Sequence, residues 1–324
     1  MTGRTEKEIA STKKMQEKLK ELPKIFSEFY YYMCSTKSYT TVERYIAYVR
    51  EFAEFLNDGD IPNNFYKRVT PLDINKYFAA MKNKESAHGH YNTSDSIRAT
   101  KWSALNTFFG FLKSNNYIAN NPMERTERPK VQDRPDVAYL TEEEIQAMLD
   151  NVNKLASTKM KNRDLAIIML GLTTGLRVSA ITQIDISDID FKNNTIKVIE
   201  KRGKTCNILI GDKVKEQIEL WLQDRKKYFS MTDSDALFIS SFKKRITRDG
   251  IRVILEKYSK DVTNKHVTPH VLRHSCATNL YEKTGDIYLC ATVLNHKNIA
   301  TTMRYASMSK DKKQKAANIL NDMI

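Results

Sequence analysis

Apolar residues recur along this chain at spacings of three and four, and this period constrains the fold more than any other feature. Residues spaced in this way lie on one face of an α-helix. The clearest example is residues 38–58, where the apolar positions are Tyr45, Tyr48, Val49, Phe52, Phe55 and Leu56. Glycine and proline number only 10 and 7 in 324 residues, which disfavours a sandwich or barrel of many short strands. The chain is therefore predicted to be mainly α-helical.

Four helices are predicted in the first 120 residues. They cover residues 5–21, residues 38–58, a segment that begins at Thr70-Pro71, and residues 94–115. Thr40 or Thr41 is expected to cap the second of these, and its aromatic stripe is expected to face a protein core. Residues 82–93 are expected to form a polar loop.

A charged stretch with three prolines separates two apolar halves. Residues 120–141 hold few apolar side chains, as an interdomain linker does. Thr141 and Glu144 then have the spacing of a capping box, which opens a new helix. We therefore predict an N-terminal helical extension, a helical domain, a linker and a C-terminal domain, over residues 1–24, 25–120, 121–138 and 139–324.

The C-terminal domain is predicted to be α+β. A helix over residues 163–174 ends at Gly175, and Arg177 opens the next short helix. Residues 195–200 and 205–210 are rich in β-forming residues and flank the turn from Lys201 to Lys204, a pattern typical of a β-hairpin. A short strand is expected over 236–240, and helices are expected over 212–229, 247–261, 268–284, 286–295, 299–307 and 309–323.

The chain carries a formal net charge of +14, from 53 lysines and arginines against 39 aspartates and glutamates. Residues 1–130 and 131–324 are each basic, which suits contact with a polyanion, although a merely soluble basic protein has the same balance. No apolar run approaches the roughly 18 residues of a membrane span, and the N-terminus lacks the apolar stretch of a secretory signal. The four cysteines lie far apart without a CxxC pair, which favours reduced thiols in a cytoplasmic protein.

The segment from Thr268 to His274 is the most informative part of the sequence. Thr268 and Pro269 have the order of a helix N-cap and first turn, so a helix begins there. His270 and Arg273 then share one face near the helix N-terminus, where free amides, the helix dipole and a guanidinium suit an anion such as phosphate. A zinc site of His270 and His274 is disfavoured, because neither an HExxH pattern nor a third ligand accompanies them.

Further motifs lie before and after the segment from Thr268 to His274. Arg177 lies in the run Thr-Thr-Gly-Leu-Arg, Lys201 lies in the hairpin turn, and Tyr305 comes nine residues after His296. In this order and at these spacings the chain resembles the tyrosine recombinases, also called the phage integrase family. The resemblance covers nearly the whole chain and is most specific over residues 171–201 and 268–305. Position by position it implies six catalytic residues: Arg177, Lys201, His270, Arg273, His296 and Tyr305.

These residue types suit the cleavage of a phosphodiester. Nucleophilic attack gives a pentavalent, doubly negative transition state, which needs cations aimed at its non-bridging oxygens. The resemblance assigns that task to Arg177, Arg273 and His296, and the nucleophile to Tyr305. Proton donation to the leaving 5′-oxygen falls to Lys201, with Lys204 as the alternative. A phosphotyrosyl bond conserves the energy of the cleaved bond, so no metal, cofactor or ATP is expected.

The sequence departs from the family pattern at two positions. Ala180 stands where many members carry an acidic residue that supports the first arginine, and nearby Asp185 is a possible substitute. Asn295 stands where the family has a glycine before the last histidine. Since asparagine tolerates left-handed backbone geometry, that loop is expected to keep its conformation.

The resemblance also implies partners and architecture. A core-binding helical domain and a catalytic domain are expected to close around double-stranded DNA. A monomer in solution is expected to form a homotetramer on paired recombination half-sites and to exchange strands through a Holliday junction. The charged N-terminus does not look like a β-rich arm-binding domain, which points to the two-domain members, either resolvers or integrases of mobile elements. Two alternatives stay open: a type IB topoisomerase, which relaxes supercoils without site specificity, and a non-catalytic DNA-binding regulator.

Overall fold

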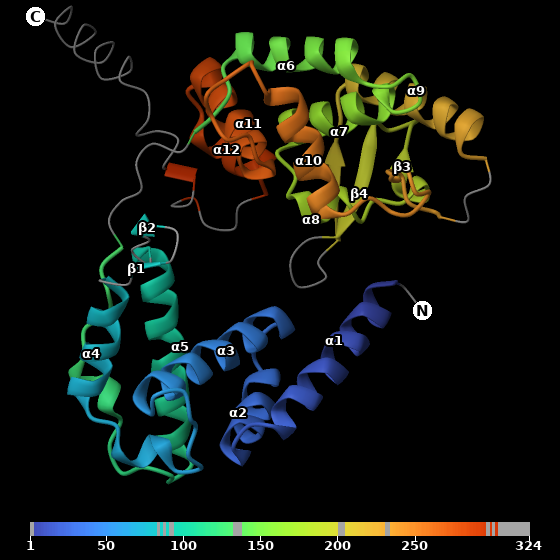
Figure 1. Ribbon diagram of the computed structural model, residues 1–324. Helices are drawn as coiled ribbons and strands as arrows, with labels where there is room; N and C mark the ends of the chain where they lie inside the picture. Colours follow the sequence, from blue (N-terminus) through green and yellow to red (C-terminus); the bar gives the residue numbers. More distant parts are fainter. Residues whose placement is uncertain are drawn as a thin grey trace, which may run out of the picture. The chain divides into compact units, whose positions relative to one another are not determined.

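The structure is a computed structural model that describes residues 3–82, 85–86, 89–90, 94–131, 138–199, 205–230, 234–295, 299 and 302–303. The chain divides into two compact units, Met1–Arg134 and Pro135–Ile324 (Figure 1). Helices dominate both units, and a three-stranded antiparallel sheet belongs to the second. The predicted fold class, mainly α with a small β-hairpin, is thereby confirmed.

Helices make up most of the described residues of the first unit. They are α1 (Gly3–Lys20), α2 (Lys24–Cys34), α3 (Tyr39–Leu56), α4 (Pro71–Lys82) and α5 (Asp95–Ser114), with the short 3-10 helices η1 (Phe65–Arg68) and η2 (Pro122–Arg125). The sequence analysis did not identify α2, which begins directly after its N-cap, Pro23. The predicted polar loop over 82–93 contains the two-residue strands β1 (Glu85–Ser86) and β2 (Gly89–His90), which pair antiparallel. Strands of two residues are too short to show an alternating pattern.

Aromatic side chains fill the core of the first unit. The ring of Phe108 in α5 lies with its centroid 5.1 Å from that of Phe29, 6.0 Å from that of Phe65 and 6.4 Å from that of Phe26. Offset and edge-on contacts of this kind add to the free energy of burial. These rings join α2, η1 and α5 in one core.

The buried face of α3 differs from the aromatic stripe predicted for it. The buried positions are Val42, Ile46, Val49, Phe52 and Ala53. Phe55 is 41% exposed, although its ring packs on that of Tyr77 at 5.2 Å. An aliphatic face and an aromatic face both have helical spacing here, and only packing against α5 selects between them.

Two smaller predictions for the first unit are also wrong. Ser38 is the N-cap of α3, in place of Thr40 or Thr41. Ile97, expected on the buried face of α5, is 44% exposed, because it lies in the first turn and burial along this helix begins at Ala99.

The described helices of the second unit surround a small sheet. They are α6 (Glu142–Leu155), α7 (Lys161–Thr174), α8 (Val178–Ile181), α9 (Asp212–Tyr228), α10 (Arg248–Ser259), α11 (Pro269–Thr284) and α12 (Ile287–Val293). The strands, in sheet order, are β3 (Ile189–Asp190, after the 3-10 helix Ile186–Asp188), β4 (Thr195–Ile199) and β5 (Thr205–Leu209). None of the helices in the described ranges is long and apolar enough to cross a membrane.

The predicted hairpin is present as β4 and β5. The two strands pair antiparallel, with Val198 opposite Cys206. The connecting turn, with Lys201 and Lys204, lies outside the described residues. The third strand, β3, was not predicted, again because it has two residues.

The strand predicted over 236–240 is wrong. This segment forms two isolated bridges, between Asp185 and Ala236 and between Ile239 and Arg245. Residues 236–239 are almost fully buried, so their apolar character reflects burial and not sheet pairing. Of the two C-terminal helices predicted over 299–307 and 309–323, the structure describes residues 299, 302 and 303, and the last two are helical.

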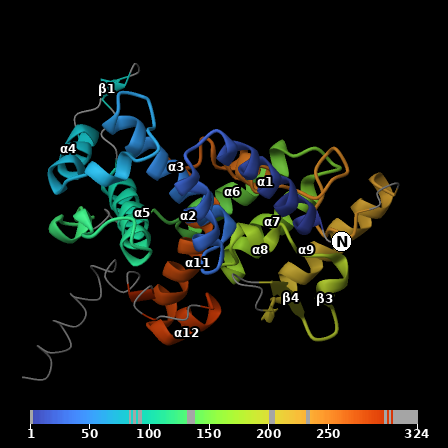
Figure 2. The same cartoon turned by 90° about the horizontal axis from the view of Figure 1, so that it is seen from below.

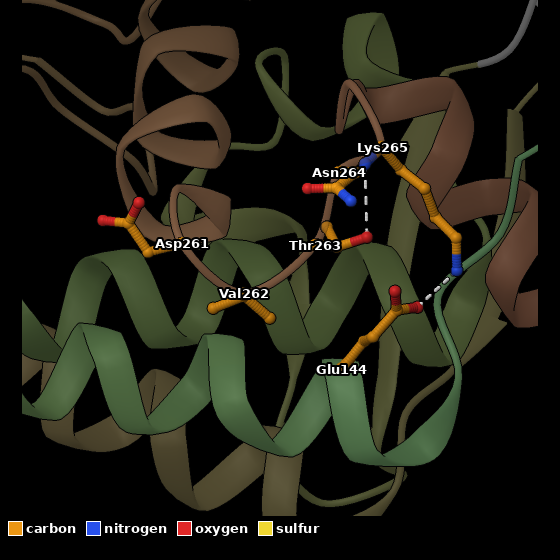
Figure 3. A pocket seen from close by; sticks show the side chains of 6 residues that line it. All are labelled: Glu144, Asp261, Val262, Thr263, Asn264 and Lys265. Carbon is orange, nitrogen blue, oxygen red and sulfur yellow. Dashed lines mark hydrogen bonds and ion pairs between the residues drawn. The ribbon is translucent and has the colours of Figure 1, made fainter.

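The helix α6 begins with the predicted capping box. The Oγ1 of Thr141 accepts a hydrogen bond from the main-chain N of Glu144 at 3.3 Å, and Thr141 N donates to Glu144 Oε2 at 2.9 Å. The same carboxylate oxygen accepts from Lys265 Nζ at 2.6 Å (Figure 3). The start of α6 is thereby bound to the segment that leads into α11.

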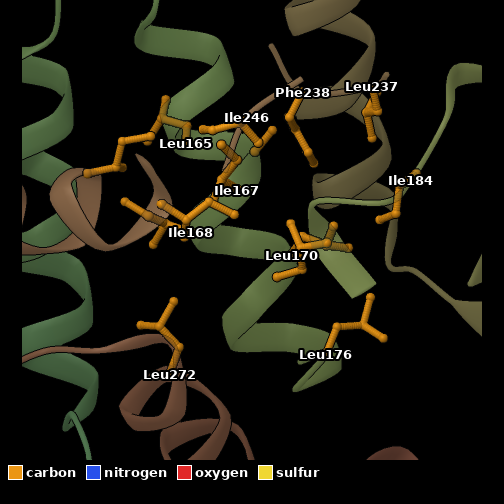
Figure 4. Close-up of a cluster of buried hydrophobic side chains, with 14 of the residues drawn as sticks. Leu165, Ile167, Ile168, Leu170, Leu176, Ile184, Leu237, Phe238, Ile246 and Leu272 are labelled. Atoms are coloured by element: carbon orange, nitrogen blue, oxygen red, sulfur yellow. The ribbon is translucent and has the colours of Figure 1, made fainter. Parts of the chain in front are cut away.

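The helix α7 is the centre of the second unit. It contacts α6, α8, α9, α10 and α11, and Figure 2 shows α6, α8, α9 and α11 around it. Leu165, Ile167, Ile168 and Leu170 of α7 are buried in one cluster with Leu272 of α11 (Figure 4). A helix that is apolar on several sides needs neighbours on all of them. This packing fixes the position of the C-terminal end of α7, which Gly175 and Arg177 follow directly in the sequence.

Candidate active site

The first part of the site is the turn between α7 and α8. Gly175 ends α7 in the left-handed conformation, with φ of 59°. A Cβ atom at this position would collide with Leu294 Cδ2 and lie 3.4 Å from Cys276 Sγ. Glycine is therefore required twice, for its backbone angle and for its lack of a side chain. Two residues later, Arg177 is the half-buried N-cap of α8, as predicted.

The second part of the site is Arg273 on α11. The helix begins as predicted, with Thr268 Oγ1 accepting from Val271 N and Pro269 in the first turn. Arg273 is only 7% exposed. Its Nη1 donates to the carbonyl of Gly175, and its Nη2 donates to the carbonyl of Leu294 at 2.8 Å.

These two hydrogen bonds join motifs that are far apart in sequence. Gly175 precedes Arg177 by two residues, and Leu294 precedes His296 by two. The guanidinium of Arg273 therefore binds both the turn that precedes Arg177 and the end of α12 to helix α11. The planar fork of arginine suits this task, because its N–H groups point in fixed directions at two acceptors.

His270 lies one turn before Arg273 on the same helix. Its side chain is exposed, in the first turn of α11, where main-chain N–H groups have no acceptor within the helix. An exposed imidazole at this place can reach a bound anion. The other three predicted catalytic residues, Lys201, His296 and Tyr305, lie outside the described residues.

The loop after α12 has the geometry expected for it. Asn295 has φ of 49°, so it takes the left-handed conformation that the family glycine would take. Its Nδ2 also donates to Cys206 Sγ on β5 at 3.4 Å. The loop before His296 is thus connected both to Arg273, through Leu294, and to the predicted catalytic hairpin, through Asn295.

The position after Arg177 that is acidic in many family members is occupied here by a buried alanine. Ala180 is 6% exposed and packs in the core of the second unit. Asp185, considered as its substitute, forms an ion pair with Arg245, whose Nη1 also donates to the carbonyl of Thr182. The carboxylate of Asp185 is therefore used to hold the segment that follows α8.

Sequence reasoning missed residues that attach α11 to the start of the second unit. Ser275, fully buried, accepts a hydrogen bond from Leu140 N at 2.8 Å, and Asn279 Nδ2 donates to the carbonyl of Leu140 at 3.2 Å. Ser275 and Asn279 lie one turn apart on the helix that carries Arg273. Their spacing was visible in the sequence, but nothing in it indicated a hydrogen-bond partner 135 residues away.

All four cysteines are free thiols, and two of them are buried near Arg273. Cys276 lies one turn after Arg273, and Cys290 Sγ donates to the carbonyl of Ala277 at 3.6 Å. Burial raises the pKa of the Cys276 thiol to about 12, although the positive charge of Arg273 opposes this shift. The thiol is consequently neutral at physiological pH.

Two hollows on the described surface are lined by residues other than Arg177, His270 and Arg273. The larger one, about 490 Å³, is lined by residues 261–265 and Glu144, and Glu144 is bound to Lys265 there (Figure 3). Across the described residues, no group of three or more histidine, cysteine, aspartate or glutamate side chains is placed to hold a metal ion.

The fold and these motifs define a family of proteins. The profile of the phage integrase family matches residues 138–312, which is more than half of the chain. The chain therefore belongs to the phage integrase family, the tyrosine recombinases, and is an enzyme of that class. The family resemblance found in the sequence is confirmed.

Particular relatives span most of the chain. A tyrosine recombinase XerC of Pediococcus pentosaceus is 30% identical over 300 residues, 90% of this chain and 96% of the relative. A tyrosine recombinase XerC of Herpetosiphon aurantiacus is 30% identical over 286 residues, 85% of this chain and 90% of the relative.

Solved structures share the fold at lower identity. The XerH site-specific recombinase bound to a palindromic difH substrate has a TM-score of 0.68 at 18% identity, covering 92% of this chain and 95% of that one. The Tn1549 transposon integrase in complex with a circular intermediate DNA has a TM-score of 0.69 at 19% identity, covering 91% and 99%.

Proposed function

We propose that this protein is a site-specific DNA recombinase or integrase that cleaves and rejoins strands through a 3′-phosphotyrosyl intermediate. The observation that supports this most is the hydrogen bonding of Arg273, which gathers the turn of Arg177 and the loop before His296 around one helix. Cations from three distant motifs are useful together only if they act on one group. A phosphate with several negative oxygens is such a group.

The proposed reaction transfers a phosphoryl group from one oxygen to another. The phenolic oxygen of Tyr305 forms a bond to the scissile phosphorus as the bond from phosphorus to the 5′-oxygen breaks. The phenol loses its proton to solvent, and the 5′-oxygen gains one from Lys201, with Lys204 as the alternative donor. Rejoining is the reverse, with the 5′-hydroxyl of a partner strand as nucleophile, so strand exchange proceeds through a Holliday junction.

The other predicted catalytic residues bind the phosphate in this reaction. Arg177 and Arg273 neutralise charge that develops on the non-bridging oxygens, and His270 donates a hydrogen bond from the exposed first turn of α11. The two carbonyl acceptors keep the guanidinium of Arg273 in one orientation before DNA binds, which lowers the entropy lost in reaching the transition state. His296 supplies a further hydrogen bond to the phosphate.

We also propose that both basic halves of the chain contact duplex DNA. The first unit then acts as a core-binding domain, residues 121–138 as a linker, and the second unit as the catalytic domain. Paired half-sites would assemble a homotetramer from free monomers. Lysine and arginine contacts to phosphates release counterions, so affinity for DNA should fall steeply with salt concentration.

The covalent intermediate provides the test. Duplexes that the wild-type protein selects from a randomised pool are incubated with it and resolved on denaturing gels. We expect a protein–DNA adduct with the wild type, none with Tyr305→Phe, and equal DNA binding by the two, because only the phenolic oxygen can form the new bond. Tyr288→Phe is the matched control: this tyrosine is 73% exposed on α12, and its loss should leave the adduct intact.

An adduct that persists in Tyr305→Phe would contradict the choice of nucleophile. Binding without any adduct by the wild type would favour a non-catalytic regulator. Relaxation of a supercoiled plasmid that lacks the selected sequence would favour a topoisomerase.

A further inference from the structure

Asn295 connects two parts of the active site that lie on different elements. It follows α12, and its Nδ2 donates to Cys206 Sγ on β5 at 3.4 Å. Cys206 pairs with Val198 on β4, so this contact reaches a strand whose register is already set by the hairpin. Both side chains are half-buried, which restricts the competition from water.

The backbone of Asn295 makes its side chain informative. With φ of 49° the residue occupies the region that glycine enters most easily, and the family motif has glycine there. Any side chain at this angle carries a conformational cost, which is smaller for asparagine than for most residues. Asparagine is present in spite of this cost, and its side-chain amide donates a hydrogen bond to β5. Glycine cannot make this hydrogen bond, which indicates that the bond itself has a function.

The contact is well placed to control the hairpin. The residue before Asn295 is fixed by Arg273, which binds the carbonyl of Leu294. The amide of Asn295 then fixes the first half of β5, and the turn with Lys201 immediately precedes that strand. A thiol sulfur is a weak acceptor, so the contact is suited to orient the hairpin more than to stabilise the fold.

We propose that Asn295 is a positioning residue for the proton-donation step. It acts through Cys206 by holding strand β5 of the hairpin against the arginine-bound end of α12, and the predicted general acid lies in the sequence between β4 and β5. This inference rests on the proposed function. In the step concerned, the bond from phosphorus to the 5′-oxygen breaks and that oxygen takes the lysine proton.

A change of leaving group isolates this step. In one duplex the cleavage position mapped for the wild type keeps its ordinary phosphodiester, and in a second the 5′-bridging oxygen is replaced by sulfur. An alkoxide needs a proton to leave, whereas a thiolate leaves without one, because thiols have a pKa of about 8.5. Single-turnover adduct formation is measured on both duplexes at saturating protein.

Asn295→Gly is the principal variant. Glycine relieves the left-handed backbone, so the protein should unfold at the same or a higher denaturant concentration. We expect adduct formation on the ordinary duplex to slow by about tenfold, a fraction of the roughly 100- to 10,000-fold that a general acid supplies. On the sulfur-containing duplex, the rate should match that of the wild type.

Cys206 variants complete the test. Cys206→Ala removes the acceptor and should reproduce the defect of Asn295→Gly, and the double variant should be no slower than either single one. Cys206→Ser keeps an acceptor and should restore the rate, and Cys34→Ala, an exposed cysteine of the first unit, should change nothing.

Two results would overturn the proposal: equal slowing of Asn295→Gly on both duplexes, or no slowing on the ordinary one. Failure of the proposed function has a different signature, since the wild-type protein itself would then form no adduct on either duplex.

Discussion

Among the described residues of the second unit, two arginines are buried, and their guanidinium groups have different partners. Both donate to main-chain carbonyls, Arg163 through Nη1 to Ile239 at 2.8 Å, and Arg163 also pairs with a carboxylate. Arg163 on α7 is 8% exposed, and its Nε and Nη2 donate to the carboxylate of Asp164 at 2.8 and 2.6 Å. Arg273 on α11 is 7% exposed, and its Nη1 and Nη2 donate to the carbonyls of Gly175 and Leu294.

The difference lies in what happens to the positive charge. A carboxylate neutralises Arg163, and Tyr258 OH donates to the other oxygen of that carboxylate at 2.7 Å, which closes a network between α7 and α10. The carbonyls of Gly175 and Leu294 orient the guanidinium of Arg273. We therefore expect Arg163 to serve the stability of the fold and Arg273 to serve the reaction proposed above.

The largest effect should come from Arg273→Lys. Lysine keeps the charge but loses the planar fork, so we expect adduct formation to fall by about 100- to 1000-fold per folded molecule. Single-turnover kinetics at saturating protein measure this. Arg163→Lys is the matched variant and should reduce stability while leaving that rate nearly unchanged. Equal loss of rate in both variants would remove the distinction between the two arginines.

The next effect should be the loss of stability in Asp164→Asn. This change leaves the buried charge of Arg163 without its carboxylate, which costs about 3–5 kcal/mol of unfolding free energy. Urea denaturation followed by circular dichroism measures it. Asp249→Asn is the control, because Asp249 forms an exposed pair with Arg252 at 3.7 Å, and its loss should cost less than about 1 kcal/mol. If Asp164→Asn lost no more unfolding free energy than Asp249→Asn, Asp164 would not be the residue that neutralises the charge of Arg163.

The smallest effect concerns the thiol beside Arg273. Burial raises the pKa of Cys276 to about 12, so the folded state keeps this proton at pH values where the unfolded state, with a pKa near 8.5, loses it. The stability due to this group is therefore complete below about pH 8.5 and falls by about 1.4 kcal/mol per pH unit as the pH rises toward 12.

Denaturation at pH 8, 9 and 10 of the wild type and of Cys276→Ala checks this prediction. The wild type should lose more stability over this range than the variant. Parallel pH profiles would contradict the prediction, because they would mean that the thiol ionises at the same pH in the folded and unfolded states.

The sequence was most predictive where the signal is local. The capping box of Thr141 and Glu144, the Pro269 start of α11 and the Gly175 end of α7 all appear where they were expected. Each depends on atoms within one helical turn, so neighbouring residues contain the whole signal. The six motif positions identified the family for the same reason: their order and spacing are properties of the chain itself.

The predictions failed where burial or strand pairing depends on contacts between segments that are distant in the sequence. It placed the aromatic stripe of α3 in the core, where the structure buries a more aliphatic face, and it took the buried run over 236–240 for a strand. Burial and strand pairing both favour apolar residues, and only the neighbouring elements distinguish them.

The sequence by itself determined the helical class, the start of α6, the end of α7, the start of α11 and the family with its candidate residues. The tertiary structure alone decided which acceptors those residues meet. Arg273 binds a carbonyl 98 residues away and another 21 residues away, and Asn295 reaches a sulfur 89 residues away. Hydrogen bonds act over about 3 Å in space and leave no periodic trace along the chain, so they exist only once the helices have packed.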